Sequence, residues 1–141
     1  MKRLFLVILA AVAVISLNYS AFATEDKPAA KVIAYYFHGN FRCPTCQAME
    51  KYSKEAIENN FKNELASGKL EFKAVNTDEQ GNEHFVRDYQ LYTKSLVLSL
   101  VKGGKETKAK NLTQIWDRVR NKQSFIDYVD EEVANFLKEA K

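Results

Sequence analysis

Runs of apolar residues in the first half of the chain predict two strands with a helix between them. Residues 32–37 (VIAYYF) are continuously apolar, which is typical of a short strand buried on both faces. In residues 44–66 apolar side chains recur every three to five positions, which predicts an amphipathic helix that ends at Ser67 and Gly68. In residues 70–75 apolar and charged side chains alternate, so we expect a second strand there.

The second half predicts a short helix, a β-hairpin and a helical C-terminal region. Residues 83–90 fit a short helix, and residues 96–101 (LVLSLV) fit a well-buried strand. Gly103 and Gly104 form a two-residue hairpin signal, and a return strand is expected over residues 105–110. Apolar residues at helical spacing then follow: Ile115, Trp116, Val119, Phe125, Val129, Val133, Phe136 and Leu137.

The predicted order of elements is β-α-β-α-β-β-α, which indicates an α/β fold. The first β-α-β unit requires parallel strands and a right-handed crossover. The hairpin adds an antiparallel strand, and the terminal helix is expected to cover one face. We therefore expect a central mixed sheet flanked by helices.

Composition fits one folded domain. The chain has 141 residues, of which 46% are hydrophobic and 28% are charged, and this excludes a disordered chain. Two cysteines are too few for a disulfide-dense secreted scaffold. The sequence contains no Gly-rich dinucleotide-binding loop, so we expect no organic cofactor.

The N-terminus has the pattern of an export signal. Lys2 and Arg3 precede an uncharged apolar stretch over residues 4–17, and Ala21 and Ala23 form an A-x-A cleavage pattern. The apolar stretch is shorter than the roughly 20 residues of a membrane-spanning helix. We therefore predict a signal peptide over residues 1–23 that is cleaved after Ala23, and an exported, periplasmic protein. An uncleaved membrane anchor is the alternative.

Removal of this segment leaves a lead-in over residues 24–30 and one domain over residues 31–141. Without Lys2 and Arg3 the chain carries 19 basic and 18 acidic side chains. This near balance argues against a nucleic-acid-binding protein.

The candidate chemistry lies at Cys43-Pro-Thr-Cys46, which follows a buried strand and begins a helix. A helix N-terminus offers free N–H groups and a partial positive charge, and both stabilise the reactive thiolate. We expect Cys43 at the cap as the exposed nucleophile and Cys46, one turn inward, as the resolving thiol. Pro44 suits the first helical position, where its missing N–H has no partner. Arg42 is positioned to lower the pKa of the thiol further.

Four interpretations of this pair compete: a redox-active dithiol, a structural disulfide, a metal site and a vestigial motif. The sequence context favours a redox-active dithiol. A structural disulfide would close a very short loop and constrain the unfolded chain little. A metal site needs two further ligands, and the histidine candidates, His38 and His84, lie far apart in the sequence.

The sequence resembles the thioredoxin-like superfamily over residues 31–141. The resemblance is carried by VIAYYFHGNFRCPTCQAMEK, GKLEFKAVNTDE and LVLSLVKGGKE, which look like the first core strand with its active-site loop and helix, the next strand, and the hairpin strand. Within the superfamily, YYFHGNFRCPTC is similar to small exported ArsF-type proteins, which are named as subunits of nitrophenyl-compound nitroreductases. The resemblance implies a thioredoxin-like fold and disulfide exchange with partner proteins.

The chain departs from the superfamily in three places. The superfamily places a cis-proline before the hairpin strand, whereas this chain has Lys94 and Ser95 there, for which we expect a trans peptide bond. These two residues are candidates for the substrate-docking loop. The first core strand lacks the family's buried aspartate, and the active-site loop lacks its tryptophan. A proton for the leaving thiol would then come from His38, Glu50 or water.

Three aromatic residues, two near the motif and one in the C-terminal region, have a core or a surface interpretation. Tyr36 and Phe41 could shape a partner-docking surface or pack in the core and at its rim. Trp116 lies at helical spacing with Ile115 and Val119, which predicts core packing.

Taken together, these features predict an exported thiol–disulfide oxidoreductase, acting as a monomer on partner thiols and disulfides without a cofactor. Two alternatives stay open. One is a periplasmic protein that binds soft metals or arsenicals through Cys43 and Cys46. The other is a non-catalytic subunit of a larger reductase.

Overall fold

The computed structural model describes residues 29–141. The predicted signal peptide, its cleavage site and most of the lead-in lie outside the described residues. Within residues 29–141, no helix is both long and apolar enough to cross a membrane.

Four strands form one mixed sheet in the order β2-β1-β3-β4. The strands are β1 (Ala30–His38), β2 (Leu70–Asn76), β3 (Ser95–Lys102) and β4 (Lys105–Asn111). β1 pairs with β2 in parallel and with β3 antiparallel, and β3 pairs antiparallel with β4. Each predicted strand is confirmed and is one to three residues longer than the apolar pattern indicated, because pairing continues into the flanking polar residues.

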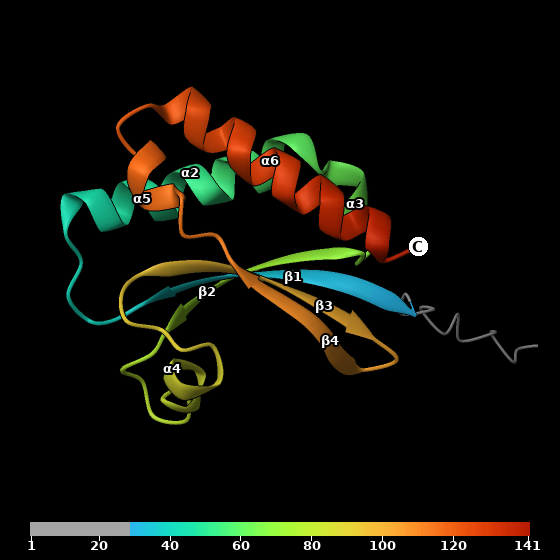
Figure 1. The fold of residues 1–141 in the computed structure, drawn as a ribbon, viewed down its shortest axis with the longest axis horizontal. Coiled ribbons are helices and arrows are strands. Elements are labelled where there is room, and N and C mark those ends of the chain that lie inside the picture. Colours follow the sequence, from blue (N-terminus) through green and yellow to red (C-terminus); the bar gives the residue numbers. More distant parts are fainter. Residues whose placement is uncertain (1–28) are drawn as a thin grey trace, which may run out of the picture.

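The helices cover the two faces of the sheet unequally (Figure 1). α2 (Pro44–Asn60), α3 (Lys62–Ala66), α5 (Ile115–Arg118) and α6 (Lys122–Glu139) lie over one face. Only the short α4 (His84–Asp88) lies over the other face among the described residues. α2 begins close to the C-terminal end of β1, since only residues 39–43 separate them.

Side chains of β1 alternate between the two faces, as a strand requires. Val32, Ala34 and Tyr36 are fully buried in the core under the helices. On the other face Phe37 packs with Leu91 and with aromatic side chains of the α4 segment. Both faces of β1 are therefore covered near its C-terminal end, which explains why that part of its sequence is continuously apolar.

Two predicted helical regions are each divided in the structure. The helix expected over residues 44–66 is interrupted at Phe61, whose φ of −126° and ψ of 39° are not helical. Phe61 leaves the helix at this point and packs its ring against the core. The C-terminal region is divided because Asn121 accepts a hydrogen bond from the Ser124 N–H at 3.1 Å and begins α6 as its cap.

The order of elements and the strand pairings are those of a thioredoxin-like α/β fold. In this fold the loop between β1 and α2 lies at the carboxyl edge of the parallel strand pair. Open α/β sheets bind their ligands at this edge. The fold thus places residues 39–43 at the position where chemistry is expected.

Candidate functional site

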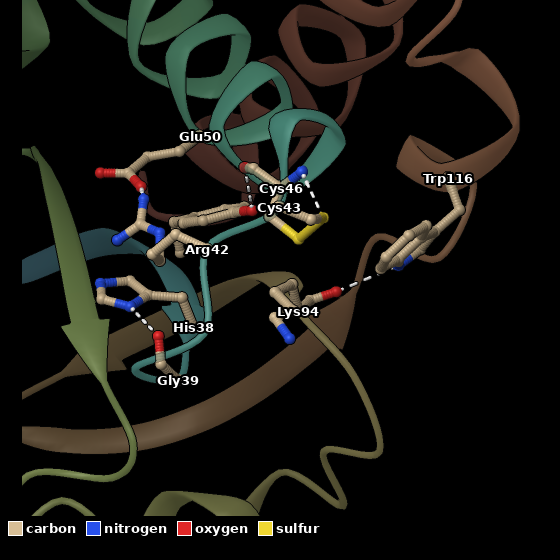
Figure 2. Close-up of a disulfide and its surroundings, with 9 residues drawn as sticks. His38, Gly39, Arg42, Cys43, Cys46, Glu50, Lys94 and Trp116 are labelled. Carbon is tan, nitrogen blue, oxygen red and sulfur yellow. Dashed lines mark hydrogen bonds and ion pairs between the residues drawn. A yellow bond between two sulfur atoms is a disulfide. The ribbon is translucent and has the colours of Figure 1, made fainter.

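The two cysteines form a disulfide at the N-terminus of α2 (Figure 2). Their Cα atoms are 5.0 Å apart. Cys43 is the N-cap, with an extended backbone, and its sulfur accepts a hydrogen bond from the Cys46 N–H at 3.1 Å. Pro44 occupies the first turn of the helix. The local geometry predicted from the sequence is therefore present, including the sulfur at the cap.

The two sulfur-bearing residues differ in exposure. Cys46 is 2% exposed, whereas Cys43 is half-buried. A reagent or partner approaching from solvent therefore reaches Cys43 first. The free N–H groups of the first helical turn also favour a thiolate at this cap. Exposure and electrostatics therefore both favour Cys43 as the attacking thiolate.

Arg42 and Glu50 pair with each other. Their side chains form an ion pair and are 29% and 26% exposed. In Figure 2 the Glu50 carboxylate points toward Arg42 and away from the two sulfurs. Each group thus has its charge balanced by the other, and neither side chain forms a hydrogen bond with a cysteine in the described part of the chain. Their roles in proton exchange and thiolate tuning stay predictions.

His38 ends β1 and is tied to neighbouring backbone. Its Nδ1 lies 3.0 Å from the carbonyl oxygen of Gly39, and its own carbonyl accepts the Thr77 N–H at 2.7 Å. Figure 2 places its ring on the Arg42 side of the disulfide. Its hydrogen bonds within residues 29–141 do not include either cysteine, so a role in proton exchange stays a prediction as well.

Lys94 and Ser95 differ in whether their side chains are accessible at the site. Lys94 lies beside the disulfide in Figure 2, with its ammonium nitrogen 5.6 Å from the centre of the Phe41 ring. Ser95 is 4% exposed, and its hydroxyl donates to the Thr93 carbonyl at 3.0 Å. The peptide bond between them is trans, since residues 29–141 contain no cis bond. Of the two residues, Lys94 is the one whose side chain faces the site.

Trp116 contradicts its prediction as a core residue. It is 37% exposed, and its indole N–H donates to the Lys94 carbonyl at 3.0 Å. The reason is that α5 has only four residues and buries Ile115, so the next side chain points outward. Figure 2 shows Trp116 reaching toward Lys94 on the side of the disulfide opposite Arg42.

Several large apolar side chains are exposed, and three of them line one cleft. Phe41 is 74% exposed and Tyr92 is 94% exposed, and Val86 is exposed as well. These three, with Lys94, line a cleft of about 230 Å³ between the β1–α2 loop and α4. We call the exposed residues Phe41, Val86, Tyr92 and Trp116 the apolar rim. Exposed apolar patches of this kind mark surfaces that contact other molecules.

Hydrogen bonds join the loop that carries Phe41 to the end of β2 and the turn that follows it. The Asn40 N–H donates to an Asp78 carboxylate oxygen at 2.7 Å, and the Asn76 amide donates to the Asn40 side-chain oxygen at 2.8 Å. A Cβ atom on Gly39 would lie only 2.7 Å from the same Asp78 oxygen. This close approach explains why glycine stands at position 39.

Tyr36 is part of the site in a way that the sequence did not indicate. It is fully buried, so the prediction that it packs in the core is confirmed and a docking role is wrong. Its hydroxyl donates a hydrogen bond of 2.7 Å to the Cys46 carbonyl. Burial raises the pKa of Tyr36 to about 12, although the nearby charge of Arg42 opposes the shift. A tyrosine within an apolar strand pattern gives no signal of this contact.

Residues 29–141 contain no group of three or more His, Cys, Asp or Glu side chains that could hold a metal ion. The Nδ1 of His84 lies 2.8 Å from the Gly81 carbonyl oxygen, and that of His38 lies 3.0 Å from the Gly39 carbonyl oxygen. The metal ligands that the CxxC pair would need are therefore not gathered around it in the described residues.

The chain is only distantly similar to known proteins. No protein-family model matches the chain, and no curated protein matches it in sequence. Among solved structures, thioredoxin from Fasciola hepatica is 15% identical, with a TM-score of 0.43 over 79% of this chain and 82% of that one. Trxlp from Edwardsiella tarda is 17% identical, with a TM-score of 0.38 over 65% and 80%.

Thioredoxin f2 from Chlamydomonas reinhardtii is 11% identical, with a TM-score of 0.35 over 70% of this chain and 83% of that one. All three scores lie below 0.5, so the strand order and pairings carry the fold assignment. The chain has a thioredoxin-like α/β fold with a disulfide-bonded CxxC pair at the N-terminus of its first long helix.

Proposed function

We propose that this protein is an exported thiol–disulfide oxidoreductase that exchanges electrons with partner proteins through Cys43 and Cys46. The observation that carries the proposal is the unequal exposure of the two cysteines at a helix N-terminus. Cys46 is 2% exposed and Cys43 is half-buried, as a nucleophile and its resolving thiol require.

The exchange consists of two balanced steps. The Cys43 thiolate attacks one sulfur of a partner disulfide, so that a Cys43–partner bond forms and the second partner sulfur leaves as a thiolate. The Cys46 thiol loses its proton to solvent and attacks the Cys43 sulfur, which releases the first partner sulfur. Two electrons pass to the partner, and the Cys43–Cys46 disulfide is formed. The same steps in reverse oxidise partner thiols.

The surroundings of the disulfide support a protein partner. Phe41, two residues before Cys43, is exposed, and so is Trp116, which Figure 2 draws on the other side of the disulfide from Arg42. Phe41 also lines a cleft with Tyr92 and Lys94. A dissolved small thiol does not need this area, whereas a partner polypeptide gains affinity by covering it. The sequence-based prediction of export is consistent with this chemistry, because disulfides persist outside the cytoplasm. The similarity to ArsF-type proteins belongs to the same proposal and specifies no substrate.

A trapping experiment tests the proposal. The Cys46→Ser variant retains the attacking thiol but lacks the resolving one, so it is expected to accumulate a mixed disulfide with a disulfide-containing protein such as insulin. The Cys43→Ser variant is the matched control and is expected to trap little, since its remaining thiol is buried. Detection is by non-reducing electrophoresis and mass spectrometry. Equal trapping by both variants, or none by either, would contradict the proposal.

A further inference from the structure

A buried hydroxyl lies directly beneath the resolving cysteine. Tyr36 of β1 is fully buried, and its hydroxyl donates to the Cys46 carbonyl at 2.7 Å. This bond joins the strand to the first turn of α2, across ten residues of sequence that include the whole active-site loop. It is a direct link between the core and one of the two reacting residues.

Core packing alone does not account for the hydroxyl. Phenylalanine would fill the same space with its ring, and the neighbouring positions in this core are apolar. Burial of a hydroxyl is unfavourable unless it is hydrogen-bonded. The Cys46 carbonyl satisfies it. Because burial raises the pKa of Tyr36 to about 12, the hydroxyl keeps its proton, and so remains a donor, where cysteine thiols titrate.

The first turn of a helix is its least restrained part, because its N–H groups lack helical partners. In the disulfide form the Cys43–Cys46 bond restrains this turn covalently. Once that bond is broken, the hydrogen bonds that still restrain Cys46 within residues 29–141 are its N–H bond to the Cys43 sulfur, its helical bonds and the bond from the Tyr36 hydroxyl. The Tyr36 bond is the one that fixes Cys46 to the sheet.

We propose that Tyr36 is a positioning residue for the resolving step: its hydroxyl holds Cys46 so that the Cys46 sulfur stays within reach of Cys43. This inference rests on the proposed function. Restricting two groups to a reactive geometry raises their effective concentration and hence the rate of the intramolecular step. Tyr36 touches neither sulfur and acts through the backbone of Cys46.

The affected step can be isolated with glutathione. Reduced protein attacks oxidised glutathione through Cys43, giving a Cys43–glutathione mixed disulfide and one glutathione thiolate. The Cys46 thiolate, its proton lost to solvent, then attacks the Cys43 sulfur. The Cys43–Cys46 bond forms, the Cys43–glutathione bond breaks, and the second glutathione leaves as a thiolate that takes a proton from water. The first step depends on glutathione concentration and the second does not.

Tyr36→Phe removes the hydroxyl and keeps the ring in the core. We expect it to slow the second step by about three- to tenfold, the range that loss of one hydrogen bond produces. In a Cys46→Ser background, where only the first step occurs, Tyr36→Phe is expected to leave the rate unchanged within about twofold. Tyr52→Phe is the matched control, because Tyr52 lies on α2 and packs against Phe125 away from the cysteines.

Each result decides the inference. A slower second step with an unchanged first step and an unaffected Tyr52→Phe control supports it. Normal closure of the disulfide in Tyr36→Phe overturns it and leaves the proposed function intact. Equal slowing of both steps also overturns it, because that indicates general loosening of the helix. If the wild-type protein forms no mixed disulfide at all, the inference fails together with the proposed function.

Discussion

The two flanks of the disulfide differ in how far their side chains are exposed to solvent. On the inner flank Tyr36, Cys46 and Met49 are at most 2% exposed, and the Tyr36 hydroxyl is hydrogen-bonded. On the outer flank Phe41 and Tyr92 are exposed over most of their surface and line a cleft together with Lys94. The inner flank fixes the positions of the sulfurs, and the outer flank is free to contact a partner.

The comparison predicts that substitutions on the two flanks separate stability from activity. Changes on the inner flank are expected to alter the free energy of unfolding, because buried side chains lose contacts that nothing replaces. Changes on the outer flank are expected to alter reaction with proteins while stability stays nearly constant. Three substitutions on the flanks test this separation, and a fourth, at Asp130, probes a site away from both; they follow in order of expected effect.

Met49→Ala is expected to have the largest effect. Met49 is fully buried on α2, three residues after Cys46, and its truncation leaves a cavity in the main core. We expect a loss of about 2–5 kcal/mol in the free energy of unfolding. Denaturant unfolding monitored by circular dichroism measures it. Lys51→Ala, at an exposed position of the same helix, is the control and should change stability by less than about 0.5 kcal/mol.

Phe41→Ala and Tyr92→Ala are expected to affect activity rather than stability. Both side chains belong to the apolar rim, and their loss removes surface that a protein partner would cover. We expect kcat/KM for a protein disulfide to fall about 5- to 20-fold, equivalent to about 1–2 kcal/mol. The rate with glutathione should change less than twofold. A parallel fall with both substrates would show that the rim acts on the disulfide itself.

Asp130→Asn is expected to have the smallest effect, far from the disulfide. Burial raises the pKa of Asp130 from 3.8 to about 6. The hydrogen bond from Asn60 lowers this pKa, and the negative charge of Asp127 raises it further. Between these pKa values the folded protein binds more protons than the unfolded chain, so stability should rise as the pH falls from about 7 to 4.

The effect should stay below about 1 kcal/mol, because the carboxylate is partly exposed to solvent. Unfolding curves at several pH values measure the contribution, and the difference between wild type and Asp130→Asn isolates this group from the other carboxylates. The reduction potential of Cys43 and Cys46 should be unchanged in the variant. An identical pH dependence in the two proteins would contradict the assignment to Asp130.

The inner flank was more accessible to sequence reasoning than the outer one. The strand patterns and the position of Cys43 at a helix cap follow from local periodicity and capping rules, and both are confirmed. The exposure of Trp116 could not be predicted, because helical spacing does not reveal that α5 stops after one turn. The non-helical backbone of Phe61 likewise depends on packing against the core.

Contacts between distant segments were also missed. The bond from Tyr36 to Cys46 and the pairing of Arg42 with Glu50 require knowledge of how α2 lies against β1. Helical spacing made Glu50 one candidate for proton exchange near the sulfurs and a solvated side chain the alternative, whereas Figure 2 shows its carboxylate turned toward Arg42. Sequence reasoning therefore located the cysteine pair and named several of its neighbours, but it did not reveal how those neighbours contact one another.

The reduction potential of the Cys43–Cys46 pair tests the central claim most directly. The mature protein is equilibrated with glutathione and dithiothreitol buffers, its thiols are alkylated, and the oxidised fraction is measured by mass spectrometry. The account predicts a reversible two-electron transition between about −270 and −120 mV, the range of thioredoxin-fold carriers. A disulfide that resists reduction below about −300 mV would contradict the account and identify a structural bond.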